Sequence, residues 1–189
     1  MKLGLTGGIG CGKSEALRIF GEIGWKTLST DTVARDLLDH DPKVREAIGQ
    51  TFGTLERKEI AAQAFQNPEK KAALEGILHP RIRQTWVEAL ESKPKANWVV
   101  EIPLLIEKSL ETHFDLVVCV ASSPGIQLQR LLQRGMTRED ALARIENQAP
   151  LPEKIEKSDI VLTNNGPISF LEAQIRALSQ RFDMPRDPC

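Results

Sequence analysis

The stretch of sequence that decides the fold lies near the amino terminus and reads Gly7-Gly8-Ile9-Gly10-Cys11-Gly12-Lys13-Ser14. It satisfies the pattern G-x-x-x-x-G-K-[ST], in which glycines free the backbone so that successive N–H groups turn inward around a phosphate. The apolar run from Lys2 to Thr6 predicts a strand before it, and the residues after it predict a helix. Since the N-terminal end of a helix is positive, it would face the same phosphate. The stretch therefore predicts a phosphate-binding loop, or P-loop.

Four further short runs, rich in Val, Ile and Leu, predict strands that are covered on both faces. They are Trp25 to Ser29, Asn97 to Glu101, Leu116 to Val120 and Asp159 to Leu162. Segments with helical spacing separate them, and the clearest runs from Ile168 to Phe182 with Pro167 at its first position. This alternation predicts an α/β fold of the P-loop NTPase type, with three layers and a five-stranded parallel sheet flanked by helices.

Two stretches are too long for simple crossovers between strands. Residues 36–95 contain several helical patterns and no convincing strand, and residues 127–156 are charged, helical and rich in Arg. We interpret both as insertions above the sheet edge, where open α/β sheets bind ligands. The core would then comprise residues 1–35, 96–126 and 157–189 of a single unit. Within the first insertion, His79-Pro80 predicts the end or a kink of a helix.

Composition limits the classes of protein that fit. The 189 residues carry 25 Lys and Arg against 26 Asp and Glu, so there is no basic footprint for nucleic acid. No run reaches the roughly 18 apolar residues of a membrane span, and no signal peptide is evident. The cysteines Cys11, Cys119 and Cys189 lie far apart and fit no disulfide or zinc pattern. We expect a soluble, cytoplasmic protein with no nucleic-acid or membrane partner.

A phosphate loop alone does not distinguish a switch protein from a kinase. A GTPase switch needs a guanine-reading NKxD motif and a DxxG motif, and neither is present. A small-molecule kinase needs an acceptor site facing the γ-phosphate and a closing lid, which the two insertions could supply. We therefore favour a kinase. Phosphorylation of a different small hydroxyl acceptor, or an ATP-dependent binding module, are the alternatives.

Two acidic residues lie at the carboxyl ends of predicted strands and are candidates for chemistry: Asp31 follows one strand, and Glu101 is the last residue of another. Asp31 could accept the proton of an attacking hydroxyl, or it could be the N-cap of a helix beginning at Thr32. Arg35, four residues later, could bind an acceptor phosphate or pair with Asp31. Glu101 could hold Mg²⁺ through water beside the Ser14 hydroxyl, or it could be a solvated acid at a strand end.

The second insertion contains a cluster of arginines: Arg130, Arg134, Arg138 and Arg144. The first two lie four residues apart and would share a helical face. A guanidinium binds two phosphate oxygens at once, which suits a lid over a nucleotide. The alternative is a charged surface helix in which these arginines pair with Glu139, Asp140 and Glu146. We favour a lid, because one kinase active site commonly needs two or more cations.

Taken together, these residues resemble one family, dephospho-CoA kinase, over nearly the whole chain. The resemblance rests on Leu5 to Gly10 with Gly12-Lys13-Ser14, Asp31 with Ala34-Arg35, Leu55-Glu56-Arg57 with Phe65, Leu78-His79-Pro80, Pro103 to Glu107, Arg138, Arg144-Ile145, Gln148, and Ser158-Asp159 with Asn164-Asn165-Gly166. The sequence departs from the family at Ser29 and Glu101, where Asp is usual. It also departs at Glu15, where Thr is usual and where a carboxylate would repel nucleotide unless it turns away.

The resemblance implies transfer of the γ-phosphate of ATP to the 3′-hydroxyl of the ribose in dephospho-CoA, the final step of coenzyme A biosynthesis. It implies Mg²⁺ as cofactor and a monomer or weak homo-oligomer with a helical acceptor-binding insertion and a helical lid. The implied ATP-binding residues are Gly8, Ile9, Gly10, Cys11, Gly12, Lys13, Ser14, Glu15, Arg134, Asn165 and Gly166. The implied acceptor-binding residues are Asp31, Arg35, Arg57, His79, Arg83, Leu105 and Gln148. Catalysis is assigned to Asp31, Lys13, Arg138 and Arg144, and metal binding to Ser14 and, through water, Glu101.

Overall fold

The structure is a computed structural model that describes residues 1–183 of the chain. The end of the predicted core, with Cys189, lies outside the described residues. Contacts divide the chain into two compact units, of which the second spans Thr30–Pro94 and the first comprises the rest. The second unit thus begins six residues before the predicted insertion and includes Asp31 and Arg35. The predicted lid belongs to the first unit.

The first unit is built on a parallel sheet of five strands. They are β1 (Lys2–Gly7), β2 (Lys26–Ser29), β3 (Trp98–Glu101), β4 (Leu116–Ala121) and β5 (Ile160–Thr163), in the order β2-β3-β1-β4-β5. All five predicted strands are confirmed to within one residue at each end. Because the chain moves to one side of β1 first and to the other side later, the order reverses at β1. A crevice for ligands is expected at the carboxyl end of such a strand.

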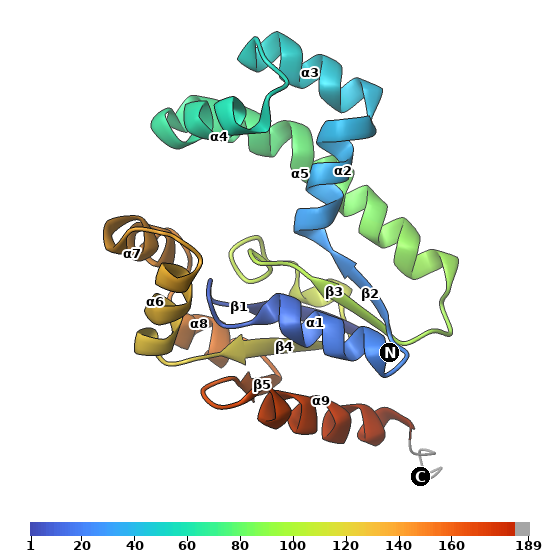
Figure 1. Ribbon diagram of the computed structural model, residues 1–189. Helices are drawn as coiled ribbons and strands as arrows, with labels where there is room; N and C mark the ends of the chain where they lie inside the picture. Colours follow the sequence, from blue (N-terminus) through green and yellow to red (C-terminus); the bar gives the residue numbers. More distant parts are fainter. Residues whose placement is uncertain (184–189) are drawn as a thin grey trace. The chain divides into compact units, whose positions relative to one another are not determined.

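One face of the sheet is covered by α1 (Lys13–Glu22) and α9 (Ile168–Asp183), which pack against each other (Figure 1). Leu3 and Leu5 of β1 join the hydrophobic core beneath these helices. Trp25 lies at the far end of this core, where its indole N–H donates to the Ser179 hydroxyl at 2.9 Å. Helix α9 begins one residue after Pro167, which was predicted as its first position.

The other face of β1 is covered so closely that it requires glycine. A Cβ on Gly4 would lie 2.6 Å from Leu105 and 2.8 Å from Phe114. Helix α8 (Leu151–Glu156) also contacts β1 and β4, and its residue Lys154 donates to the Pro103 carbonyl at 2.7 Å. Helices therefore flank the sheet on both faces, which confirms the predicted three-layer α/β fold.

We expect Gly4→Ala to destabilise the first unit by about 1–3 kcal/mol, because the added methyl group overpacks the contact with Leu105 and Phe114. Denaturant unfolding followed by far-UV circular dichroism measures the change. The matched control is Gly76→Ala, since a Cβ there meets nothing within 4 Å and Ala is the better helix former. Equal stability of the Gly4→Ala variant and the parent would contradict the packing described.

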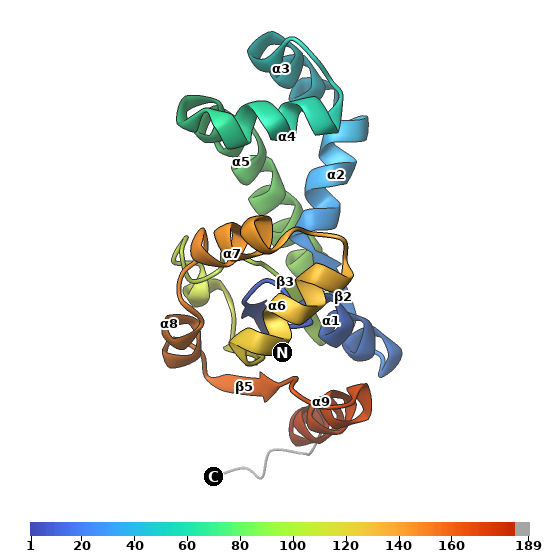
Figure 2. The same cartoon turned by 60° about the vertical axis from the view of Figure 1, so that its left-hand side comes forward.

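The predicted lid is helical, as expected, and lies between β4 and β5 in the chain (Figure 2). It comprises most of α6 (Pro124–Gln133), then α7 (Arg138–Glu146) and α8. Helices α6 and α7 pack together. The Thr137 hydroxyl caps α7 by accepting from the Asp140 N–H at 3.1 Å.

The second unit consists of helices, which confirms that residues 36–95 lack strands. They are α2 (Thr30–His40), α3 (Pro42–Phe52), α4 (Arg57–Gln66) and α5 (Pro68–Ser92). Asp41 and Asn67 are the N-caps of α3 and α5, and each precedes a proline at the first helical position. A core of apolar residues that includes Val44, Ile48 and Leu78 joins the helices.

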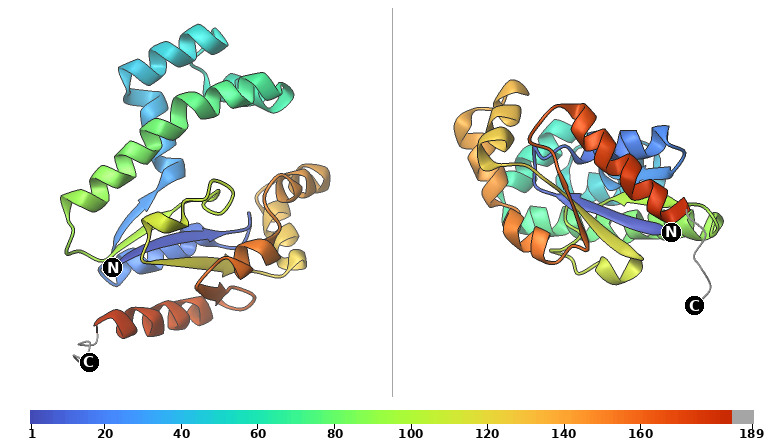
Figure 3. Two further views of the ribbon diagram at one scale, coloured as in Figure 1. Left: turned by 180° about the vertical axis from the view of Figure 1, so that it is seen from behind. Right: turned by 90° about the horizontal axis from the view of Figure 1, so that it is seen from below.

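The prediction that His79-Pro80 ends or kinks a helix is wrong about the end. Helix α5 continues through Pro80, and Figure 3 shows it as one coil. A proline inside a helix costs about 3 kcal/mol. Apolar residues on both sides of it, Leu78 and Ile82 among them, pack into the core of this unit and offset that cost. His79 therefore lies in the helix interior.

None of the helices within the described residues combines the length and the apolar character that a membrane span needs.

Candidate active site

The phosphate loop has the backbone conformation that its glycines predict. Gly10 and Gly12 have φ angles of 79° and 97°, a region that other residues rarely adopt. A Cβ on Gly7 would lie 2.2 Å from the Val120 carbonyl oxygen. Helix α1 begins directly after Gly12, so its first N–H groups face the same space as the loop. The loop therefore connects the carboxyl end of β1 to a positive helix end.

The Lys13 side chain lies along the loop rather than in solvent. It is only 9% exposed, and its ammonium donates to the Gly7 and Gly8 carbonyls at 3.0 and 3.1 Å. A compact, flexible point charge held at the loop can turn toward phosphate oxygens when a nucleotide binds. This placement agrees with the role expected for Lys13.

Ser14 and Glu101, which are 87 positions apart, meet beside the loop. The Ser14 hydroxyl donates to a Glu101 carboxylate oxygen at 3.4 Å, and Glu101 is 3% exposed. The alternative of a solvated acid at the strand end is therefore wrong. A hydroxyl and a carboxylate are hard oxygen ligands of the kind that Mg²⁺ takes together with water and phosphate oxygens. These residues fit the metal expected here.

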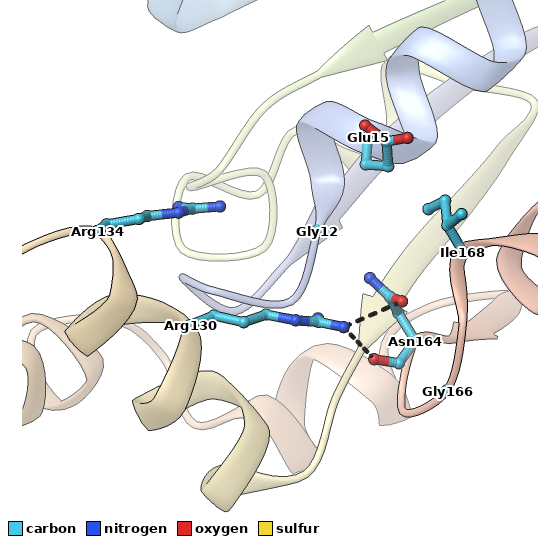
Figure 4. A pocket seen from close by; sticks show the side chains of 7 residues that line it. All are labelled: Gly12, Glu15, Arg130, Arg134, Asn164, Gly166 and Ile168. Carbon is cyan, nitrogen blue, oxygen red and sulfur yellow. Dashed lines mark hydrogen bonds between the residues drawn. The ribbon is translucent and has the colours of Figure 1, made fainter.

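A pocket of about 220 Å³ opens next to the loop (Figure 4). Its lining residues come from the loop and the first turn of α1, from α6 and the residue after it, and from the segment between β5 and the start of α9: Gly12, Glu15, Arg130, Arg134, Asn164, Gly166 and Ile168. Of the predicted nucleotide contacts, Gly12, Glu15, Arg134 and Gly166 line it. Asn165 does not, because its side chain accepts from the Ser123 N–H at 2.7 Å and joins the segment after β5 to the start of α6.

Arg130 and Asn164 tie three segments together at this pocket. The Arg130 guanidinium donates to the Gly10 carbonyl at 3.2 Å and to the Asn164 carbonyl at 3.0 Å. The Asn164 amide donates to the Cys11 carbonyl at 2.9 Å. Arg130 was predicted only as a member of the arginine cluster, and Asn164 only as part of a motif that resembles the family. Neither was predicted as an individual nucleotide contact. The spacing of Arg130 and Arg134 was a signal, because both line the pocket, Arg130 from α6 and Arg134 from the residue that follows this helix.

The other lid arginines are exposed and available. Within residues 1–183, the side chains of Arg134, Arg138 and Arg144 make no hydrogen bond or ion pair. The alternative in which they pair with Glu139, Asp140 and Glu146 is therefore wrong. In α7, Arg138 is the first residue and Arg144 lies in the last turn.

Five of the predicted acceptor-binding residues, Asp31, Arg35, Arg57, His79 and Arg83, lie in the second unit. Asp31 lies in the first turn of α2, which begins at Thr30, so Asp31 is not the N-cap. Asp31 and Arg35 are exposed, and within the described residues they form no ion pair. Arg57 pairs with Asp39 at 3.4 Å. His79 is partly buried, and the exposed Arg83 follows it by one turn of α5.

The comparison with protein families decides which kind of kinase this fold and loop represent. The model of one family, dephospho-CoA kinase, matches residues 1–169. The chain belongs to the dephospho-CoA kinase family. Members of this family catalyse the final, ATP-dependent step of coenzyme A biosynthesis.

Individual relatives agree over the full length. The dephospho-CoA kinase of Deinococcus radiodurans is 40% identical over 194 residues, covering 97% of this chain and 93% of that protein. The crystal structure of a Thermus thermophilus protein has a TM-score of 0.81 at 31% identity, covering 96% of this chain and 97% of that one. Dephospho-CoA kinase from Campylobacter jejuni has a TM-score of 0.72 at 28% identity, covering 96% and 98%.

In this dephospho-CoA kinase, two neighbouring strands end side by side, and only one of them ends in an acid. Ser29 and Glu101 are register partners in β2 and β3, at the two positions where the family usually has Asp. The longer Glu101 side chain still reaches the Ser14 hydroxyl. The departure at Glu101 therefore keeps an acid beside the P-loop.

Leu105 does not fit its predicted role as an acceptor contact. It is fully buried, and its side chain packs against Gly4 on the sheet. In this conformation it offers no surface to a substrate. Cys11 is also fully buried, so only its backbone can take part in the P-loop of this kinase.

The charge of Glu15 is partly compensated. Its carboxylate accepts from the Arg18 guanidinium, with contacts of 2.5 and 3.1 Å. The hydrogen bond from Arg18 lowers the pKa of Glu15, so the carboxylate stays ionised while facing the pocket. Arg18 also pairs with Glu22 on the same helix.

Glu15→Thr is expected to tighten ATP binding by about 2- to 5-fold, because it removes a negative charge that faces phosphates across solvent. Isothermal calorimetry measures the dissociation constant. Glu22→Thr is the matched control, since it removes the other partner of Arg18 without lining the pocket, and we expect no change in affinity. Equal or weaker binding by Glu15→Thr would refute the repulsion.

Proposed function

We propose that this chain transfers the γ-phosphate of ATP to the 3′-hydroxyl of the ribose in dephospho-CoA, giving CoA and ADP. The observation that supports it best is the P-loop with Lys13 on it and the Ser14–Glu101 contact beside it. This arrangement lies in a chain that matches the dephospho-CoA kinase family over residues 1–169.

In this proposal the P-loop N–H groups bind the ATP phosphates, and Lys13 turns from the loop carbonyls to the β- and γ-phosphates. The pocket lined by Arg130, Asn164 and Ile168 receives the rest of the nucleotide. Ser14 and, through water, Glu101 hold Mg²⁺, which neutralises charge on the phosphates.

The acceptor is bound by the second unit. Asp31 orients the 3′-hydroxyl and accepts its proton, since it is exposed and has no partner among the described residues. Candidate contacts to the remainder of dephospho-CoA are Arg35, Arg57, His79 and Arg83. Arg134, Arg138 and Arg144 supply positive charge to the transferred phosphoryl group when the lid closes.

The enzyme requires ATP, dephospho-CoA and Mg²⁺, and it has no nucleic-acid or membrane partner. It works in the cytoplasm as a monomer or a weak homo-oligomer. Size-exclusion chromatography with light scattering measures the last point.

An analogue of dephospho-CoA that lacks the 3′-oxygen tests whether the 3′-hydroxyl is the phosphoryl acceptor. Dephospho-CoA should stimulate ADP release, and its 3′-deoxy analogue should bind without doing so. Adenosine 5′-monophosphate and 4′-phosphopantetheine, the two halves of the acceptor, serve as a small panel. Equal stimulation by the 3′-deoxy analogue would refute the 3′-hydroxyl as the acceptor, and stimulation by another hydroxyl compound alone would favour a different small-molecule kinase.

A further inference from the structure

Two glutamine side chains make hydrogen bonds to the backbone of Ile9, which lies in the middle of the P-loop. Its N–H donates to the Gln148 side-chain oxygen at 3.0 Å. Its carbonyl accepts from the Gln127 side-chain amide at 2.8 Å. Gln127 comes from α6 and Gln148 from the connector between α7 and α8, so two separate segments fix the same loop residue.

The approach of Gln127 accounts for two of the loop glycines. A Cβ on Gly8 would lie 2.4 Å from the Gln127 amide nitrogen, and a Cβ on Gly10 would lie 2.9 Å from the Gln127 carbonyl oxygen. Gln127 itself is 4% exposed. Gly8 therefore leaves room for the buried Gln127 side chain, and Gly10 leaves room for the backbone of α6 at Gln127. Both glycines also free the loop backbone.

The connector that carries Gln148 is hydrogen-bonded to an ion pair between Glu107 and the fully buried Lys154. The Lys154 ammonium lies 2.7 Å from a Glu107 carboxylate oxygen, and the Lys154 side chain is fully buried. The same Glu107 oxygen accepts from the N–H of Ala149, the residue after Gln148, at 3.0 Å. Lys154 also donates to the Pro103 carbonyl. A buried pair is costly unless it is hydrogen-bonded, and the bond from the Ala149 N–H ties the connector to this pair.

We propose that Gln127 and Gln148 clamp Ile9 and so hold the P-loop open for phosphates, and that Glu107 and Lys154 position Gln148 for this contact. All four are positioning residues. A glycine-rich loop loses much conformational freedom when it orders, and ordering it before the nucleotide arrives removes that cost from binding. The inference rests on the proposed function only in that the P-loop receives ATP.

Nucleotide affinity tests the clamp without any phosphoryl transfer. We expect Gln148→Met and Gln127→Met each to weaken the binding of the ATP analogue AMP-PNP with Mg²⁺ by about 3- to 10-fold in calorimetry, the effect of losing one neutral hydrogen bond. Asn147→Ala is the matched control, because this side chain bonds only within its own helix end. Unchanged or tighter binding by Gln148→Met, a variant of a partly exposed side chain, would overturn the clamp.

A double-mutant cycle tests the positioning role. Glu107→Gln should weaken the binding of AMP-PNP by a similar factor, and adding Gln148→Met to it should cause little further loss, because both changes remove one contact. Lys157→Met, which breaks an exposed ion pair on α8, should leave affinity unchanged. Additive losses from Glu107→Gln and Gln148→Met would show that the two residues act independently and would refute the positioning role.

Amide exchange separates positioning from simple stabilisation. In Glu107→Gln and Gln148→Met, the Ile9 N–H should exchange with solvent faster by the same factor, as measured by NMR. A lower melting temperature with an unchanged Ile9 exchange rate would mean a structural role alone. If the parent binds AMP-PNP but makes no CoA, the proposed function fails while the clamp stands. If CoA forms but the variants bind normally, the clamp fails.

Discussion

Asp31→Asn is expected to lower kcat by about 10² to 10⁴, the range for loss of a general base. The substitution keeps the size and shape of the side chain. Asp31 is exposed in the first turn of α2 and makes no hydrogen bond or ion pair within the described residues, so no packing or pairing is lost with its charge. An acid in the first turn favours the helix by only about 0.3–1 kcal/mol. The variant should therefore fold and still bind both substrates.

The measurement is steady-state turnover with dephospho-CoA beside thermal unfolding of the same preparation. Asp36→Asn provides the matched control, because Asp36 lies on the same helix and, among residues 1–183, pairs only with the exposed His40. We expect its kcat to stay within about twofold of the parent, as for most surface pairs. Unchanged turnover with a lower melting temperature in Asp31→Asn would leave Asp31 with a purely structural role.

Lys13→Ala should reduce kcat by at least about 10²- to 10³-fold, the usual loss when one preorganised donor to a transition-state charge is removed. The side chain contacts the Gly7 and Gly8 carbonyls of its own loop, so the ammonium lies where phosphate charge would develop. Lys26→Ala is the control, because it removes an exposed lysine from β2 in the same unit.

Single-turnover measurements separate the two ways in which Lys13 could act. A fall in the rate of transfer at saturating ATP indicates stabilisation of the transferred phosphoryl group, whereas a fall in affinity alone indicates ground-state binding. Near-normal turnover by Lys13→Ala would remove the basis for the P-loop assignment.

Much of the fold follows from local patterns in the sequence. The five strands were predictable because short apolar runs covered on both faces differ from the longer helical periods between them. The meeting of Ser14 and Glu101 was predictable from topology, since Glu101 ends β3 and Ser14 follows the loop at the carboxyl end of the adjacent parallel strand β1. The exposed lid arginines were predictable as a group.

Features that depend on distant packing were not predictable. The sequence shows the local cost of a proline in a helix at Pro80. It does not show that the residues on both sides of Pro80 pack into a core. Leu105 reads as a site residue from its motif, but it is buried against Gly4. The Arg130–Asn164 contacts and the Gln148–Ile9 contact join residues 34 and 139 positions apart, which no local pattern reveals. The Glu15–Arg18 pair, at helical spacing, could have been found.

The most direct test of the account is the release of ADP by purified protein with ATP and Mg²⁺, with and without dephospho-CoA, together with detection of CoA by mass. The account predicts that dephospho-CoA stimulates ADP release and that one CoA appears for each ADP. ADP release that is indifferent to dephospho-CoA, with no CoA formed, would contradict the central claim even if the nucleotide binds at the P-loop.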